Sequence, residues 1–338
     1  MKKLNVAVVG ATGLVGSTML KVLEEREFPV AQIYAFATAR SAGKTVMFHG
    51  APCVVEELTE TSFVDHDIDV ALLSAGGGTS KVYAPLAAEA GVTVIDNSSQ
   101  WRQVDGIPLV VPEVNPEVIK GYRGIIANPN CSTIQCMPIL KTLRDRYGLK
   151  RIVYSTYQAA AGAGMKGLHD LEEGTTTTFD YPLPLNVLPR IDEFMEDGST
   201  KEEWKMVQET RKILGLPDLA VTATCVRVPV DFGHGVAINA ELQDDFDLET
   251  VRADLEAQDG VIVKDDPKNH VYPIPQDCKF NDMIYVGRIR RDASQPNTLN
   301  LWCVADNIRK GAATNSVQIA EKWLEYADES WFADREEA

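Results

Sequence analysis

The sequence predicts an α/β protein of two domains, the first built on a doubly wound parallel sheet and the second an α+β domain with a mixed sheet. Strand-like and helix-like segments alternate over the first 130 residues, and the strands are apolar throughout. After Tyr147 the strand-like segments are longer and carry polar residues on one face, which is typical of a sheet with one exposed face. The chain of 338 residues also exceeds what a single hydrophobic core usually organises.

The predicted elements of the first domain follow one another as strand and helix. A buried strand at Leu4–Val9 precedes an amphipathic helix at Leu14–Glu25. Parallel strands of this kind need helices on both faces of their sheet. We therefore expect one domain over residues 1–130. Its further elements are a helix at Lys81–Ala90 and strands at Gln32–Ala37, Val70–Ser74, Val92–Asp96 and Gly124–Ala127.

The second domain is expected over residues 131–306. Between its strands, Ser199 to Glu202 has the pattern of a capping box that opens a helix, and Gly215 closes that helix. An amphipathic helix at Ile308–Ala327 lies in a last segment, about residues 307–338, that we expect to pack back on the first domain. The predicted strands are Arg151–Gln158, Val221–Val230, Gly235–Leu242 and Leu299–Val304.

The composition excludes several classes of protein. The formal net charge of −16 argues against general binding to nucleic acids or anionic membranes, and it gives weight to any local arginine cluster. No apolar run approaches the roughly 20 residues of a membrane span, and Leu4–Val9 is too short for a secretory signal. The six cysteines have no zinc-like spacing, so we expect reduced thiols, no metal site and a cytoplasmic location.

A glycine motif follows the first predicted strand and opens the first predicted helix. This context is typical of dinucleotide binding, because glycines permit a tight turn and let backbone N–H groups approach a pyrophosphate. The spacing GxxGxxG is a variant of the usual GxGxxG, and a purely structural turn is the alternative. The motif predicts a Rossmann-like domain whose cofactor-binding residues are Gly10, Thr12, Gly13, Leu14, Val15 and Gly16.

The end of the second strand distinguishes NAD from NADP. An NAD site normally carries Asp or Glu there, to bind the ribose hydroxyls. In this chain Thr38, Arg40 and Ser41 follow the strand, and these groups suit a 2′-phosphate, so we expect NADP. An exposed basic loop is the alternative. A second loop of small residues, containing Ser74 and Gly76, is expected to line the same dinucleotide.

Cys131 lies between the strand that ends at Ala127 and a helix-like segment that includes Ile134. The N–H groups and dipole at a helix N-terminus favour an anion and therefore a thiolate. A thiol of pKa about 8.5 is only about 3% ionised at pH 7, and half ionisation needs roughly 2 kcal/mol. A helix terminus supplies about 0.3–1 kcal/mol, so we expect a cationic neighbour. The alternative is a small buried hydrophobic residue.

A nucleophilic cysteine beside a nicotinamide indicates hydride transfer at an acyl carbon through a thioester. This chemistry needs a base near the sulfur and cations for an anionic substrate. Among the histidines, His234 is the best candidate because it follows a strand that also carries Arg227. A purely structural histidine is the alternative.

Several further motifs run along the chain: ATARSAGK, SAGGG, DNSSQWR, VPEVN, NPNCSTIQ, YQAAAGAG, PLPLNVLPRID, EEWKMVQETRKILG, RVPVDFGH, GRIRRD and DNIRKGAATNSVQIAE. With the GATGLVG opening, they resemble the bacterial aspartate-β-semialdehyde dehydrogenases over nearly the full length. The resemblance implies NADPH-dependent conversion of L-4-aspartyl phosphate to L-aspartate 4-semialdehyde and phosphate, in the biosynthesis of lysine (through diaminopimelate), threonine and methionine. The exposed sheet of the second domain favours a homodimer, so we expect this domain to carry both catalysis and dimerisation.

The resemblance assigns roles to three catalytic residues. In that family the cysteine of NPNCST is the nucleophile, which corresponds to Cys131. The glutamine of YQA orients the acyl group and corresponds to Gln158, and the histidine of RVPVxxGH is the acid/base and corresponds to His234. A cationic His234 would also stabilise the thiolate. Gln158 or a backbone N–H at the helix start would stabilise the oxyanion.

The resemblance also assigns binding residues. Arg227 binds the substrate carboxylate and Arg102 receives the phosphate, which suits the planar guanidinium group. The EExK motif adds Glu202 and Lys205 to the substrate site. For these two the alternatives are the acid of the capping box and the polar face of a helix. On the cofactor side, the resemblance adds Gly162 and Asn307.

Two departures from the family pattern stand near these motifs. Ala161 replaces a serine that often precedes GAG, and Gly235 follows the histidine where the family often has serine. Neither residue belongs to the reacting groups. The nearest alternative function is that of N-acetyl-glutamyl-phosphate reductase, which uses the same chemistry on a longer substrate. A non-catalytic NADP-binding sensor with a regulatory thiol is the alternative from another class.

Overall fold

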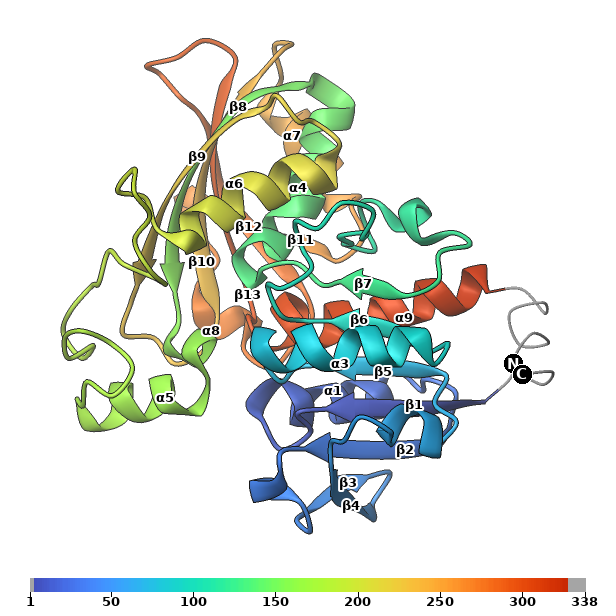
Figure 1. Cartoon of the computed structure of the whole chain (residues 1–338). Helices are drawn as coiled ribbons and strands as arrows, with labels where there is room; N and C mark the ends of the chain where they lie inside the picture. Colours follow the sequence, from blue (N-terminus) through green and yellow to red (C-terminus); the bar gives the residue numbers. More distant parts are fainter. Residues whose placement is uncertain (1–2, 328–338) are drawn as a thin grey trace. The chain divides into compact units, whose positions relative to one another are not determined.

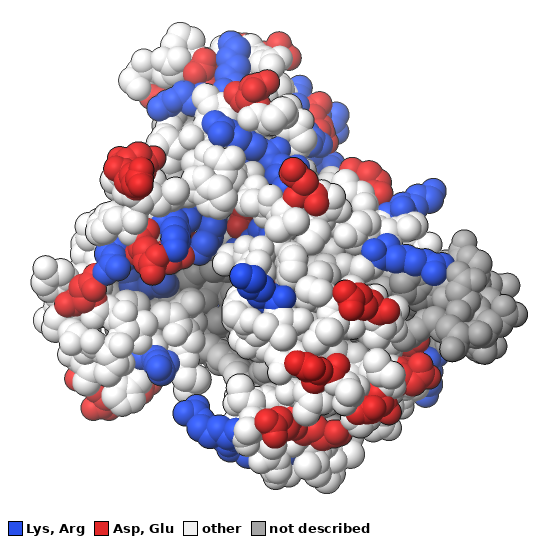
Figure 2. All heavy atoms as spheres, in the orientation of Figure 1, with Lys and Arg blue, Asp and Glu red and all other residues white. Residues whose placement is uncertain are grey.

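The computed structural model describes residues 3–327, which divide into two compact units. The first unit contains the chain up to Pro129 and again from Ala312 onward, and the second is Asn130–Gly311. None of the helices described is long and apolar enough to cross a membrane. On the face drawn in Figure 2, acidic and basic side chains are interspersed, as expected of an acidic but evenly solvated surface.

The first unit contains a seven-stranded sheet in the order β3-β4-β2-β1-β5-β6-β7. All its neighbours are parallel except β3 and β4, so the predicted parallel sheet is confirmed. The hairpin of β3 and β4 was not predicted, because its apolar runs at residues 46–48 and 53–55 are short and most of its residues are exposed. The strands are β1 (Leu4–Val9), β2 (Val30–Ala37), β3 (Thr45–Phe48), β4 (Ala51–Glu57), β5 (Val70–Leu73), β6 (Thr93–Asp96) and β7 (Ile125–Ala127).

Helices cover both faces of this sheet, as a doubly wound fold requires (Figure 1). Leu4, Val6 and Val8 of β1 belong to one apolar cluster, with residues of α1 (Leu14–Glu25) and α9 (Thr314–Tyr326). The alternate residues of β1 belong to a second cluster on the other face. The helices packed there are α2 (Ser62–Asp65) and α3 (Gly77–Glu89).

The C-terminal helix differs from the prediction at its start. A π-helical turn, Arg309–Ala313, precedes α9, so the α-helix begins at Thr314 instead of Ile308. The wider turn arises because the N–H of Gly311 donates to the carbonyl of Asp306, five residues earlier. Residues 328–338 of the predicted segment lie outside the described residues.

The second unit contains a six-stranded sheet in the order β11-β12-β13-β10-β8-β9. The sheet is mixed, as the sequence predicts. The pairs β8/β9 and β11/β12 are parallel, and the other neighbours are antiparallel. The strand predicted at Val221–Val230 ends at Arg227, ahead of Pro229, which has no N–H to donate. The strands are β8 (Leu149–Gln158), β9 (Ala220–Arg227), β10 (His234–Leu242), β11 (Val261–Val263), β12 (Ile284–Arg291) and β13 (Thr298–Ala305).

Three helices pack on one face of the second sheet: α4 (Cys131–Tyr147) on β8, β10 and β13, α6 (Lys201–Leu214) on β9, and α7 (Leu248–Glu256) on β11 and β12. Tyr154 and Ile238 are buried beneath them. The alternate residues are less covered, and Tyr157 is 42% exposed. Two further helices, α5 (Gly164–Glu173) and α8 (Pro275–Cys278), complete the unit.

The capping box of α6 lies one residue later than predicted. Thr200, not Ser199, is the N-cap, and its hydroxyl accepts from the N–H of Glu203. Glu203 returns the contact by accepting from the N–H of Thr200. Two acids follow one another at this position, and the sequence alone did not distinguish them. As a result, Glu202 is not used by the cap.

Candidate active site

Three polar residues from neighbouring strands lie side by side at one end of the second sheet. Gln158 ends β8 and pairs in register with Arg227, which ends β9. His234 begins β10, and the register that pairs Gly235 with Tyr157 brings His234 beside Gln158. All three side chains lie on the helix-covered face and are at most 5% exposed. The structure thus brings together three of the predicted site residues.

Cys131 is the first residue of α4, so the predicted helix start is confirmed. Asn130 caps this helix, and its Oδ1 accepts from the N–H groups of Ser132 at 2.9 Å and Thr133 at 3.3 Å. These two N–H groups are therefore already used by the cap. A Cβ built on Gly311, in the π-helical turn, would lie 2.8 Å from the Cβ of Cys131. Only a glycine fits against the cysteine there.

The cation beside the cysteine is Arg227 and not His234. Burial lowers the pKa of Arg227, and the charges of Glu202 and the Cys131 thiolate oppose that decrease. An arginine nevertheless stays charged at neutral pH. Burial and then the charge of Arg227 lower the pKa of His234 well below its usual 6.5. Burial and the charge of Arg227 thus disfavour the cationic His234 that the sequence led us to expect beside the thiolate.

The hydrogen bonds of His234 fix the position of its proton. Nδ1 accepts from the N–H of Ala159 at 3.0 Å, so the neutral ring carries its proton on Nε2. Nε2 is buried and has no hydrogen-bond partner among the described residues. A Cβ on Gly162 would lie 3.3 Å from this Nε2 and 2.9 Å from Nη1 of Arg227. The absent side chain of Gly162 leaves room between the two groups, and Nε2 is placed as a donor.

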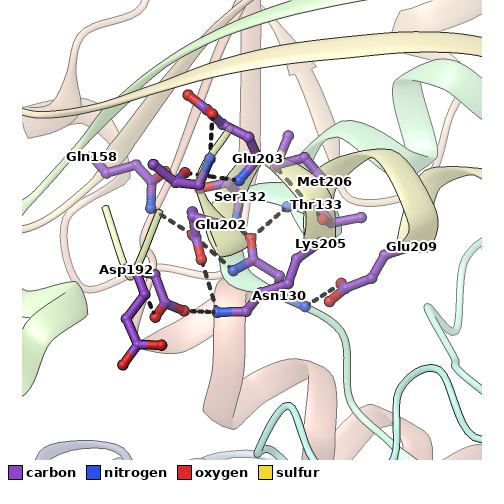
Figure 3. Close-up of polar contacts among 12 residues, drawn as sticks. Asn130, Ser132, Thr133, Gln158, Asp192, Glu202, Glu203, Lys205, Met206 and Glu209 are labelled. Atoms are coloured by element: carbon purple, nitrogen blue, oxygen red, sulfur yellow. Dashed lines mark hydrogen bonds and ion pairs between the residues drawn. The ribbon is translucent and has the colours of Figure 1, made fainter. Parts of the chain in front are cut away.

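Glu202 links several of the candidate residues (Figure 3). Its Oε1 accepts from Nε2 of Gln158 at 3.0 Å and from Nδ2 of Asn130 at 2.9 Å. Its Oε2 lies 3.2 Å from Nζ of Lys205, which also lies 2.6 Å from Asp192. Burial alone would raise the pKa of Glu202, but the charge of Lys205 and these hydrogen bonds outweigh it and lower the pKa. Glu202 is thus an anion that orients Gln158.

The glycine loop of the first unit has the geometry that its motif predicts. Gly10 has a φ of +84°, and a Cβ there would lie 2.4 Å from the carbonyl oxygen of Ser74. A Cβ on Gly16 would lie 2.1 Å from the carbonyl oxygen of Gly10. Gly13 is the N-cap of α1 and offers no side-chain acceptor. The N–H groups at the start of α1, at Leu14 and Val15, therefore receive no side-chain cap and suit a pyrophosphate.

The predicted 2′-phosphate residues follow β2 in the same unit. Thr38 and Arg40 are exposed, and Ser41 is buried with its Oγ 3.5 Å from the hydroxyl of Thr12. Gly76, with a φ of +83°, is the N-cap of α3. The second small-residue loop therefore leads into a helix that begins at Gly77, four residues before the predicted start at Lys81.

Two remaining predicted residues lie elsewhere. Arg102 belongs to the first unit, where its Nη2 donates to the carbonyl of Asn97 at 2.9 Å. Asn307 belongs to the second unit and accepts from the N–H of Gly233 at 3.0 Å. Its Nδ2 is buried and has no hydrogen-bond partner among residues 3–327. This amide is available to a ligand.

Comparisons with known proteins agree with this geometry. The family described as "Semialdehyde dehydrogenase, NAD binding domain" matches residues 5–122, and "Semialdehyde dehydrogenase, dimerisation domain" matches residues 140–310. The aspartate-semialdehyde dehydrogenase of Campylobacter jejuni is 50% identical, over 96% of this chain and 98% of its own length. The chain belongs to the aspartate-semialdehyde dehydrogenase family.

Solved structures of the family are similar to this chain over nearly its full length. Aspartate semialdehyde dehydrogenase II of Vibrio cholerae, complexed with ASA, is 46% identical with a TM-score of 0.93, and the match covers 96% of this chain and 99% of that one. The Candida albicans enzyme with NADP is 25% identical with a TM-score of 0.77, at the same coverage. The first unit of this family member therefore carries an NAD(P)-binding domain.

The structure adds residues that the sequence reasoning missed. Phe179 lies against Arg227, with the guanidinium carbon 5.6 Å from the ring centroid. Asn130 was read only as part of the cysteine motif, although an Asn just before a helix is itself an N-cap signal. Glu209, whose Oε2 accepts from the N–H of Asn130 at 2.6 Å, gave no local signal. It contacts Asn130 only through the packing of α6 on α4.

Proposed function

We propose that this protein is an NADP-dependent aspartate-semialdehyde dehydrogenase that reduces L-4-aspartyl phosphate to L-aspartate 4-semialdehyde and phosphate. The observation that carries the proposal is the constellation of Cys131 at a capped helix start with Arg227 and a neutral His234, in a chain of this family. Gln158, held at both ends of its amide by Thr156 and Glu202, completes it.

In the proposed mechanism, the Cys131 thiolate attacks the acyl carbon, and the carbon–oxygen bond to phosphate breaks. Arg227 stabilises the thiolate and binds the substrate carboxylate with the donors that the carbonyl of Ala159 leaves free. The second N–H of the Gln158 amide donates to the oxyanion. Arg102 remains the predicted ligand of the phosphate, and Lys205 remains a predicted residue of the substrate site.

NADPH, when bound, would supply the hydride for reduction at the acyl carbon, which Cys131 holds first as a thioester and then as a thiohemiacetal. The Nε2–H of His234 donates to the oxygen that develops negative charge, and the ring takes that proton back as the carbon–sulfur bond breaks. The product is the free aldehyde, and Cys131 returns to the thiolate. The N–H groups of Leu14 and Val15 at the start of α1 would hold the pyrophosphate, and Arg40 would hold the 2′-phosphate that distinguishes NADP from NAD.

We further propose a cytoplasmic homodimer. The residues that alternate with the buried face of the second sheet include Val153, Ser155 and Tyr157, which are half-exposed or exposed. Such a face suits a second copy of the chain, and the dimerisation-domain family matches this unit. All six cysteines are thiols and not disulfides, which suits a reducing compartment.

The test is an absorbance assay with purified protein, L-aspartate 4-semialdehyde, phosphate and NADP⁺. We expect phosphate-dependent formation of NADPH, with little signal when NAD⁺ replaces NADP⁺ or when phosphate is omitted. A second run replaces the substrate with N-acetylglutamate semialdehyde. Turnover of that substrate alone would assign the protein to the alternative reductase, and turnover of neither would contradict the catalytic proposal.

A further inference from the structure

One face of α6 is directed at the start of α4, and it contains more than the predicted site residues. Glu202, Met206 and Glu209 recur at the spacing of successive helical turns and therefore share a face. Each contacts the first turn of α4: Glu202 reaches the side chain of Asn130, Met206 accepts from the hydroxyl of Thr133, and Glu209 reaches the backbone of Asn130 (Figure 3). Only Glu202 was expected to act in the site.

The contact of Glu209 is the shortest of the three. Its Oε2 lies 2.6 Å from the backbone nitrogen of Asn130, and Glu209 is fully buried. A hydrogen bond from a backbone N–H to a carboxylate in such a place is strong and directional. Because Asn130 directly precedes Cys131, this bond fixes the backbone from which the nucleophile extends.

Two residues of α6, Glu202 and Glu209, bind Asn130 at its side chain and at its main chain. Glu202 holds its side-chain Nδ2, while the Oδ1 of the same amide caps α4. Glu209 holds its main chain. With both contacts present, the cap and the peptide leading to Cys131 are set independently of the substrate. Loss of the main-chain contact would let this peptide rotate and move the sulfur.

We infer that Glu209 is a positioning residue for the nucleophile Cys131, acting through the main chain of Asn130. This inference rests on the proposed function, since it takes Cys131 as the nucleophile. Displacing a reacting group by about 1 Å costs on the order of 100-fold in rate. Glu209 touches neither the substrate nor the sulfur in this scheme, so its loss should affect the chemical step more than substrate binding.

The test compares three variants in the full-length protein. Glu209→Leu removes the acceptor at similar size, and Glu209→Gln keeps an oxygen that accepts from the N–H of Asn130. Thr210→Val, the next residue of α6, is the matched control, because it loses a buried hydrogen bond to Tyr154 and has no contact with Asn130. Three quantities are measured for each: kcat and KM for aspartate semialdehyde, the rate of Cys131 alkylation by iodoacetamide, and the melting temperature.

We expect Glu209→Leu to lower kcat and the alkylation rate at least tenfold with KM changed less than threefold. Glu209→Gln should recover most of both rates, and Thr210→Val should keep both despite a lower melting temperature. Equal rates in Glu209→Leu and Thr210→Val would overturn the inference. If Glu209→Leu does not fold, Glu209→Gln provides the test. A kcat in Glu209→Gln as low as that of Cys131→Ala would overturn the inference, because this variant keeps the acceptor oxygen. Because alkylation needs no substrate, it tests the inference even if the wild-type protein does not turn over aspartate semialdehyde.

Discussion

At the scale of single residues, His234 and Arg227 lie beside each other but carry different charges. Both are buried, and burial disfavours the charged form of each. Arginine has an intrinsic pKa high enough to remain a cation, whereas histidine loses its proton. The environment therefore separates two roles: Arg227 provides positive charge, and His234 provides a neutral N–H donor.

This division predicts the effect of a conservative change at Arg227. In Arg227→Lys the charge remains, but the planar pair of donors is lost, together with the contact to the carbonyl of Ala159. Losing a charged hydrogen bond of about 1.5–3 kcal/mol should raise KM for aspartate semialdehyde roughly tenfold to a hundredfold. Steady-state kinetics check this, with the exposed ion-pair residue Arg190→Lys as control. An unchanged KM in Arg227→Lys would remove this residue from the substrate site.

A second residue-scale prediction concerns stability against pH. The folded pKa of His234 lies well below 6.5, its usual value in an unfolded chain, so below pH 6.5 the unfolded state binds more protons. The free energy of unfolding should therefore fall as pH decreases from 6.5, by about 1.4 kcal/mol for each unit of the pKa difference. Urea midpoints at pH 7.5 and 5.5 measure this.

We expect the midpoint of His234→Asn to fall less over that interval than the midpoint of the wild type. The exposed variant His270→Asn should follow the wild type. Parallel loss of stability in His234→Asn and the wild type would show that another group causes the pH dependence.

At the scale of elements, α6 shows how a shift of one residue changes function. Because Thr200 and Glu203 form the capping box, Glu202 is on the face that meets α4. Had Ser199 been the cap, Glu202 would have been used in the cap and Gln158 would have lost its partner. The adjacent acids Glu202 and Glu203 thus separate helix capping from orientation of the site.

The position of the cap can be tested directly. Thr200→Ala should lower the free energy of unfolding by about 1 kcal/mol, because the first N–H groups of α6 lose their acceptor. Ser199→Ala should change it little, since the Ser199 hydroxyl bonds only to the exposed Asp197. Chemical denaturation of both variants measures the difference. A larger loss in Ser199→Ala would restore the cap that the sequence suggested.

The helices and strands differ in how far the sequence predicts them. Buried strands such as Leu4–Val9 and the start of α4 at Cys131 follow from apolar runs and helix signals. The β3/β4 hairpin has only short apolar runs and α5 has none, and much of their surface is exposed. In the site, local motifs indicate Cys131 and the glycine loop. The contacts of Glu209, and the neutral state of His234, depend on long-range packing that no local pattern records.

At the scale of the whole molecule, the second sheet has one face beneath helices and another with exposed residues. Tyr157 is 42% exposed, and its ring packs 5.4 Å from that of Trp302. The exposed face mixes aromatic, small and polar residues, among them Ser155, Ala237 and Asn239, and we propose that a second copy of the chain covers it. In the proposed homodimer, the side of the sheet that the helices of the unit leave uncovered forms the interface.

The proposed homodimer predicts a simple measurement. Tyr157→Asp places an uncompensated charge on the exposed face, and burying it in an interface would cost several kcal/mol. Light scattering after size exclusion should then show monomers at micromolar concentration, whereas the wild type and the exposed first-unit control Val64→Asp should remain dimers. A dimeric Tyr157→Asp variant would place the interface elsewhere.

The distribution of the thiols has a practical consequence for spectroscopy. Cys136, Cys225, Cys278 and Cys303 are buried, and only Cys53 and Cys131 are half-buried. Replacing Cys53 by serine would leave Cys131 as the one cysteine within reach of a bulky maleimide dye. A fluorophore attached there would report from the position of the nucleophile, in a chain with a single substitution.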